Sequence, residues 1–177
     1  VNQSMINYSK EKGLSQTTVL AIAQDQLGFM WFGTQSGLNR YDGYEFKQYK
    51  AQPLQSDQLA GNFITALCDD GDHKMWIGTR SGLSVYDYKS GIFTSLLRAS
   101  FDNIPADNVT SLRCDGSKVW VGTEVSGFYS VDYSDHKITS YPHSKGLRIL
   151  DLYSTDKTLF LATDKGVLSQ KHGQMSL

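Results

Sequence analysis

The chain has 177 residues, of which 40% are hydrophobic and 20% charged, a composition typical of a globular protein and not of a disordered one. Lysine and arginine number 17 against 18 acidic residues, and the net charge of −1 argues against a nucleic-acid partner. The longest apolar runs, such as residues 19–23, are about five residues, far below the roughly 20 that span a bilayer.

One short motif recurs along the chain at residues 30–34, 75–79, 119–123 and 159–163. In the first copy it reads Met-Trp-Phe-Gly-Thr, and its aromatic residues recur at intervals of 40 to 45 residues. A glycine follows each copy within three or four residues and predicts a tight turn into a second strand. This period is typical of a four-stranded propeller blade.

Further apolar runs flank each copy of the motif. The runs before it cover residues 19–23, 63–67, 109–112 and 149–153, and those after it cover residues 44–49, 92–97, 137–141 and 174–177. Each unit therefore has four predicted strands, which we name A to D. The sequence predicts an all-β fold of four consecutive antiparallel propeller blades, at about residues 14–50, 61–98, 107–142 and 147–177. Residues 1–13 would add an N-terminal strand that clasps the last blade.

Strand B of each blade is apolar on both faces. Because side chains alternate along a strand, the aromatic residue and the glycine of the motif share one face, and the residues between and after them share the other. No helical pattern offers cover for either face, so neighbouring blades must supply it. The residues predicted to pack between blades are Trp31, Gly33, Trp76, Gly78, Trp120, Gly122 and Phe160.

Two local features give more specific predictions. Asp42-Gly43 between strands C and D predicts a two-residue type I′ hairpin. Cys68 and Cys114 are offset by one residue when their strands are aligned, which predicts opposite faces. Two half-buried free thiols are therefore favoured over a disulfide, although the sequence leaves the pairing open.

Residues 13–43 carry a resemblance to a known family. The segment from Gly13-Leu14-Ser15-Gln16 through the motif at Trp31 to Tyr41-Asp42-Gly43 resembles the opening repeat of the two-component regulator propellers. The other copies follow the same pattern with growing departures, and in the fourth copy Phe160 and Ala162 replace the tryptophan and the glycine.

The resemblance implies an extracytoplasmic sensor domain. Such propellers are joined through an immunoglobulin-like module and a transmembrane helix to a histidine kinase or a diguanylate cyclase. The four blades would then be the N-terminal arc of a ring of about seven, on the periplasmic or extracellular face of a bacterial inner-membrane protein. Membrane attachment would come only through segments outside this chain.

Catalytic, metal and cofactor sites each have a simpler explanation. Ser36 and Ser81 lie on sharp turns but lack the helix that follows a nucleophile elbow. The acidic run at residues 69–73 lacks the alternating spacing and distal glutamate of a calcium loop, so a polar hairpin is favoured over a metal site. No carboxylate pair stands out at axial positions, so we expect no catalytic residue, no metal and no cofactor.

Ligand-binding residues are expected at the end of the propeller where the B–C turns and D–A loops converge. The candidates are the varying turn residues Gln35, Arg80, Glu124 and Asp164. Arg40, which aligns with Val85, either covers the edge of its blade or binds a ligand.

The predicted function is a non-catalytic sensor for an unknown small molecule or glycan. The alternative is a protein-interaction or self-assembly scaffold, in which exposed end blades associate with another copy. The ligand, the output domain and the closure of the ring are not determined by the sequence.

Overall fold

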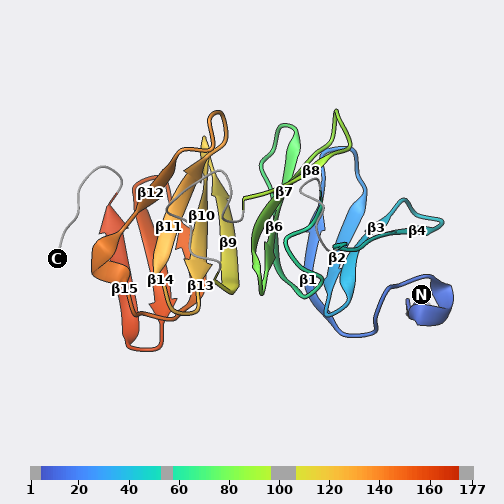
Figure 1. Ribbon diagram of the computed structural model, residues 1–177, viewed down its shortest axis with the longest axis horizontal. Coiled ribbons are helices and arrows are strands. Elements are labelled where there is room, and N and C mark those ends of the chain that lie inside the picture. The colour runs from blue at the N-terminus through green and yellow to red at the C-terminus, as the bar shows by residue number, and fades with distance from the viewer. Residues whose placement is uncertain (1–4, 53–57, 97–106, 172–177) are drawn as a thin grey trace, which may run out of the picture.

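The chain forms four antiparallel sheets that stand side by side in chain order and build an open arc (Figure 1). The computed structural model describes residues 5–52, 58–96 and 107–171. The all-β class and the four consecutive blades are confirmed. In the described residues, the only helical segments are single 3₁₀ turns at Lys10–Lys12 and Pro142–Ser144, and neither could cross a membrane.

The strands of each blade follow one another in sequence order. Blade 1 contains β1 (Val19–Gln24), β2 (Met30–Thr34), β3 (Gly37–Tyr41) and β4 (Phe46–Tyr49). Blade 2 contains β5 (Ile64–Asp69), β6 (Lys74–Thr79), β7 (Gly82–Asp87) and β8 (Phe93–Ser95). Blade 3 contains β9 (Val109–Asp115), β10 (Lys118–Thr123), β11 (Phe128–Asp132) and β12 (Ile138–Ser140). Blade 4 contains β13 (Ile149–Ser154), β14 (Thr158–Thr163) and β15 (Gly166–Lys171), and its predicted fourth strand at residues 174–177 lies outside the described residues.

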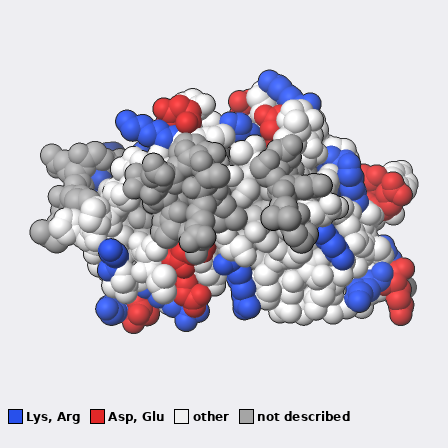
Figure 2. All heavy atoms as spheres, in the orientation of Figure 1, with Lys and Arg blue, Asp and Glu red and all other residues white. Residues whose placement is uncertain are grey.

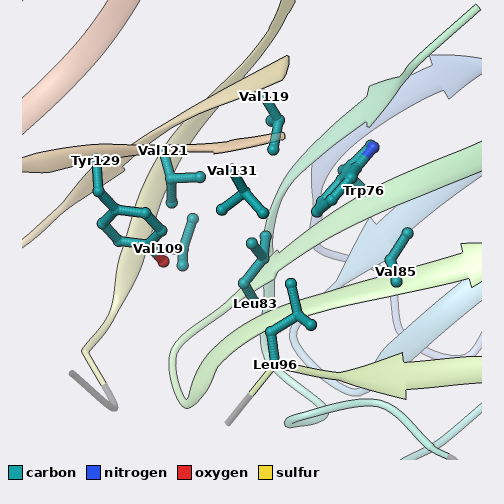
Figure 3. Packing of buried hydrophobic residues seen from close by; sticks show 9 residues of the cluster. All are labelled: Trp76, Leu83, Val85, Leu96, Val109, Val119, Val121, Tyr129 and Val131. Carbon is teal, nitrogen blue, oxygen red and sulfur yellow. The ribbon is translucent and has the colours of Figure 1, made fainter. Parts of the chain in front are cut away.

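The hydrophobic core lies between the blades. Figure 3 shows the cluster in which Trp76 and Leu83 of blade 2 meet Val121 of blade 3. Corresponding clusters around Trp31 and Trp120 join blades 1 and 2 and blades 3 and 4. The motif tryptophans therefore pack between blades, and each is at most 2% exposed.

The threonine that ends each motif fastens the B–C turn. In every blade its hydroxyl donates a hydrogen bond of 2.8 to 2.9 Å to a glycine carbonyl. This glycine is the first residue of strand C, except in blade 3, where it directly precedes the strand. This bond accounts for the threonine in the last position of the motif, because its side chain closes the turn onto the backbone.

A buried carboxylate fixes the A–B turn of blade 1. Asp25 accepts bonds from the amides of Leu27 (3.0 Å) and Phe29 (2.9 Å) and from Nε1 of Trp31 (2.7 Å). We expect Asp25→Asn to lower the free energy of unfolding by about 1 kcal/mol, because the charge-assisted bonds become neutral and an amide N–H₂ faces donors. Chemical denaturation measures this loss. Asp42→Asn, in an exposed hairpin, should change stability much less.

The hairpin between β3 and β4 differs from the prediction. The connection runs over residues 42–45, and only Gly43 of the central pair has a positive φ, whereas a type I′ turn needs two. The Asp42 carboxylate instead accepts the amides of Tyr44 and Glu45, each at 2.8 Å. These backbone bonds lower the pKa of Asp42. The aspartate thus acts as the acceptor of a longer loop.

Cys68 and Cys114 form a disulfide between blades 2 and 3, with Cα atoms 5.9 Å apart, so the expectation of free thiols was wrong. The one-residue offset is real, since Cys68 lies opposite Trp76 in its blade and Cys114 lies opposite Val119. Adjacent blades, however, meet through opposite faces. Side chains that point to opposite faces of aligned strands therefore point toward each other across the interface.

His136 in blade 3 contacts the same interface. Its ring lies edge-on to Trp76, with centroids 5.8 Å apart, and its Nε2 is buried without a hydrogen-bond partner. Burial lowers its pKa below 6.5, and Lys74 lowers it further against the opposing effects of Asp135 and Asp132.

Protonation of His136 is therefore disfavoured in the folded chain. We expect the neutral ring to make its full contribution to the free energy of unfolding above about pH 6.5. This contribution should fall as the pH drops from there toward the lowered pKa of His136. The loss should be less than about 1 kcal/mol at this half-buried site. Unfolding curves at several pH values measure the slope. His136→Asn, which tolerates the positive φ at this position, should flatten it; an unchanged slope would assign the effect to other groups.

The N-terminal segment lies against blade 1. Tyr8 contacts the rings of Tyr41 and Phe46, at 5.1 and 5.8 Å between centroids. Residues 5–8 form no strand, and Met5 and Ile6 are exposed. The clasp on a last blade stays a prediction.

Candidate functional site

A β-bulge recurs near the start of every inner strand. In β1, β5, β9 and β13 the pairing with the second strand of the blade skips one residue, directly after the first residue of the strand. The skipped residues, which we call the bulge residues, are Leu20, Thr65, Thr110 and Leu150. A bulge turns one side chain away from the alternation of the sheet, so each blade directs one residue out of its packed faces.

All four bulge residues line one cavity. The cavity has a volume of about 320 Å³ and includes Asn108, Arg148 and Ile149 beside the bulge residues. Because it joins the inner strands of all four blades at the end where the B–C turns lie, we call it the axial mouth. Its walls differ in chemistry, since blades 1 and 4 contribute the two leucines and blades 2 and 3 the two threonines.

Two polar atoms of the blade 3 wall are buried without a hydrogen-bond partner. These are Oδ1 of Asn108 and Oγ1 of Thr110. The threonine of blade 2 differs, because Oγ1 of Thr65 donates to the carbonyl of Val109 at 2.5 Å. Buried polar groups are normally paired, so the two unpaired oxygens are places where a ligand or water would gain hydrogen bonds.

Two of the predicted ligand-binding turn residues contact residues that line the axial mouth. Glu124 accepts from Nδ2 of Asn108 at 2.8 Å and pairs with the guanidinium of Arg148 at 3.4 Å. Asp164 accepts the amide of Arg148 at 3.1 Å and returns a bond to its carbonyl at 3.2 Å. Both residues therefore contact lining residues, and the charge of Arg148 is balanced by the Glu124 carboxylate.

The other three predicted ligand-binding residues lie apart from Glu124 and Asp164. Arg80 has its guanidinium 3.6 Å from the ring centroid of Phe63, and Gln35 is exposed in the equivalent turn of blade 1. Arg40 lies on β3 with its guanidinium 4.5 Å from the ring centroid of Phe29, which favours the edge-covering interpretation of its role.

Sequence reasoning missed the bulge residues, Asn108 and Arg148. A signal existed, because Asn108 and Arg148 each stand directly before the first residue of strand A, and the bulge residues directly after it. The first strand residue itself is valine or isoleucine in every copy, whereas the positions directly before and after it vary in chemistry. In the part of the chain that the structure describes, no cluster of three or more His, Cys, Asp or Glu side chains could hold a metal ion.

The first two repeats match a known family model. Residues 13–36 and 58–81 match the family described as two component regulator propeller. A stretch of 48 residues is 46% identical to Histidine kinase P4 of Formosa agariphila, covering 27% of this chain and 4% of that protein.

Solved structures extend the likeness over the whole fold. The extracellular domain of BT3049, assigned as a hybrid two component system of B. thetaiotaomicron, superposes with a TM-score of 0.80 at 27% identity, over 94% of this chain and 26% of that one. The corresponding domain of BT4673 gives a TM-score of 0.77 at 20% identity, over 97% and 23%. The chain thus spans about a quarter of these structures. The first two repeats of this chain are therefore similar to two-component regulator propeller repeats.

Proposed function

We propose that the chain is a non-catalytic sensory module of a membrane-anchored signalling protein and that it receives its ligand at the axial mouth. The similarity to the BT3049 extracellular domain supports the sensory role. The observation that carries the binding site is the repeated bulge, which directs one residue of each blade into the same cavity. The output would be a cytoplasmic kinase or cyclase in the same protein.

The proposed location is the periplasmic or extracellular side of the membrane. BT3049 and BT4673 support it, since the matching domains are extracellular. The Cys68–Cys114 disulfide is a second support, because disulfides persist in oxidising compartments and are rare in the cytosol.

The chemistry of the axial mouth favours a neutral ligand. Arg148 is balanced by Glu124, and on the face shown in Figure 2 acidic and basic side chains are interspersed without a continuous patch of either sign. The unpaired oxygens of Asn108 and Thr110 favour hydrogen-bond donors on the ligand, while Leu20 and Leu150 favour an adjacent apolar face. A neutral small molecule or a glycan combines these features.

A thermal-shift screen with neutral saccharides and other neutral metabolites tests this site. A true ligand at 100 times its Kd should stabilise the chain by about 2.7 kcal/mol, which corresponds to roughly 5–10 °C in Tm. Thr110→Val removes the unpaired hydroxyl with little change of shape and should weaken binding about tenfold. Thr139→Val on the exposed strand β12 is the matched control and should bind normally. Equal binding by the two variants would place the ligand elsewhere.

Self-assembly is a second candidate, supported by the outer face of blade 4. Phe160 occupies the position of the buried motif tryptophans yet is 40% exposed, beside Tyr153 at 61% and Val167 at 73%. Another blade-like face would cover this surface in the way that blades cover each other inside the chain. Light scattering over a range of concentrations tests this, and Phe160→Glu should abolish any concentration-dependent increase in mass.

A further inference from the structure

The Cys68–Cys114 disulfide joins the two strands that carry the polar wall of the axial mouth. Cys68 lies on β5, which begins with Ile64 and Thr65, and Cys114 lies on β9, which begins with Val109 and Thr110. Near the cavity the same strands are linked by the bond from Thr65 Oγ1 to the carbonyl of Val109. The pair is therefore fastened twice, by a hydrogen bond at the mouth and by a covalent bond near the far end of the strands.

The corresponding positions between the other blades carry no such bond. From the strand registers, Cys68 and Cys114 correspond to Ala23 and Asp69 between blades 1 and 2, and to Arg113 and Ser154 between blades 3 and 4. In the described residues, the covalent tie is thus confined to the interface between blades 2 and 3.

This interface also holds buried polar groups that have no hydrogen-bond partner. Nε1 of Trp76 and Nε2 of His136 are buried without partners in it, whereas Trp31 donates its Nε1 to Asp25. Oγ1 of Thr110 and Oδ1 of Asn108 are likewise unpaired at its mouth end. Unpaired buried polar groups weaken non-covalent packing, so a covalent bond contributes most at such an interface.

We propose that the Cys68–Cys114 disulfide is a reducible clamp that fixes the spacing of β5 and β9 and thereby regulates the polar wall of the axial mouth. This inference rests on the proposed binding function. With the bond intact, Thr65 and Thr110 are held in place across the cavity. With the bond reduced, β5 and β9 lose their covalent link and keep non-covalent contacts, among them the hydrogen bond at the mouth and the apolar cluster.

The chemistry is thiol–disulfide exchange with a dithiol reductant. One thiolate of the reductant attacks a cysteine sulfur, the S–S bond breaks, and a mixed disulfide forms. The second thiol of the reductant then attacks the mixed disulfide and releases the remaining cysteine thiol. The reductant departs as an oxidised cyclic disulfide. The two electrons and two protons that convert the bond into two cysteine thiols come from the dithiol. Both cysteines are half-buried, so they are within reach of a small reductant.

Thiol titration and amide hydrogen exchange of the full chain test the clamp without any ligand. Denatured, air-oxidised protein should show no titratable thiol, and the same protein after dithiothreitol should show two. Reduction should speed exchange at the amides of β5 and β9 by about tenfold or more, with β1 as the internal reference. The Tm should fall by about 5–15 °C.

The Cys68→Ser/Cys114→Ser variant is the control, and its exchange should not respond to dithiothreitol. Cys68→Val/Cys114→Ala fills the same space with apolar groups and replaces it if the serine variant folds poorly. Two titratable thiols in oxidised protein, or unchanged exchange in β5 and β9 on reduction, would overturn the clamp. A clear exchange response together with a failed ligand screen would keep the clamp and reject the proposed binding function, so the two failures are distinguishable.

Discussion

Trp76→Ala is expected to lower the free energy of unfolding by about 3–5 kcal/mol, the usual loss for a large buried aromatic residue. Trp76 is fully buried and packs with Leu83, Val109 and Val131 between blades 2 and 3. Its removal leaves a cavity that the two rigid sheets cannot close. At this chain length the loss corresponds to roughly 6–20 °C in Tm, measured by calorimetry.

Because blades contact only their neighbours, the loss should be local in its structural effect. Hydrogen exchange should show faster opening in β6 and β9, on the two sides of the interface, before any change in β1. Phe160→Ala is the matched control, since Phe160 occupies the equivalent position in blade 4 but is 40% exposed, and it should cost about 1 kcal/mol. Equal losses at the two positions would contradict packing between blades as the role of the motif aromatic.

Gly78→Ala is expected to lower the free energy of unfolding by about 1–3 kcal/mol through overpacking. A Cβ atom at Gly78 would lie 2.6 Å from Cγ1 and 3.2 Å from Cβ of Val109, which belongs to the next blade. Neither atom can move far, because Val109 is fully buried at the start of β9. Denaturant unfolding measures the loss.

A double-mutant cycle identifies the contact. Val109→Ala removes the obstructing methyl groups, so Gly78→Ala/Val109→Ala should be more stable than the sum of the single losses predicts, by about 1–2 kcal/mol. Ala162→Gly is the control, since blade 4 already carries a Cβ at the equivalent position, and it should change stability by less than about 1 kcal/mol. Additive losses in the cycle would show that Val109 is not the obstructing residue.

Much of the fold was predictable because the motif residues indicate how both faces of strand B are packed. A tryptophan and a glycine two residues apart define one packing face, and the residue between them defines the other, so the stacking of blades follows from alternation. The prediction for the cysteines failed because it considered the faces of each blade separately. Alternation gives the face of each side chain, but whether two faces meet depends on how neighbouring sheets stack.

The proposed binding site was less predictable, because a bulge depends on the register between two strands. The bulge residues are two leucines and two threonines, and nothing in their identity marks them as unpaired. A bulge exists only in the pairing of two strands, so a single strand read by itself looks regular. Glu124 and Asp164 could be picked out because they stand in turns between strands that the motif already fixes.

The bulges separate the lining of the axial mouth from the packing that holds the blades together. A bulge residue lies outside the ladder of its sheet and outside the tryptophan clusters between sheets, so its replacement leaves both intact. Duplicated blades could therefore diverge at this one position while keeping a common scaffold. Replacing Leu20 or Leu150 with threonine would change the lining of the cavity one blade at a time, so an array of such repeats could alter the chemistry of this cavity through single codons.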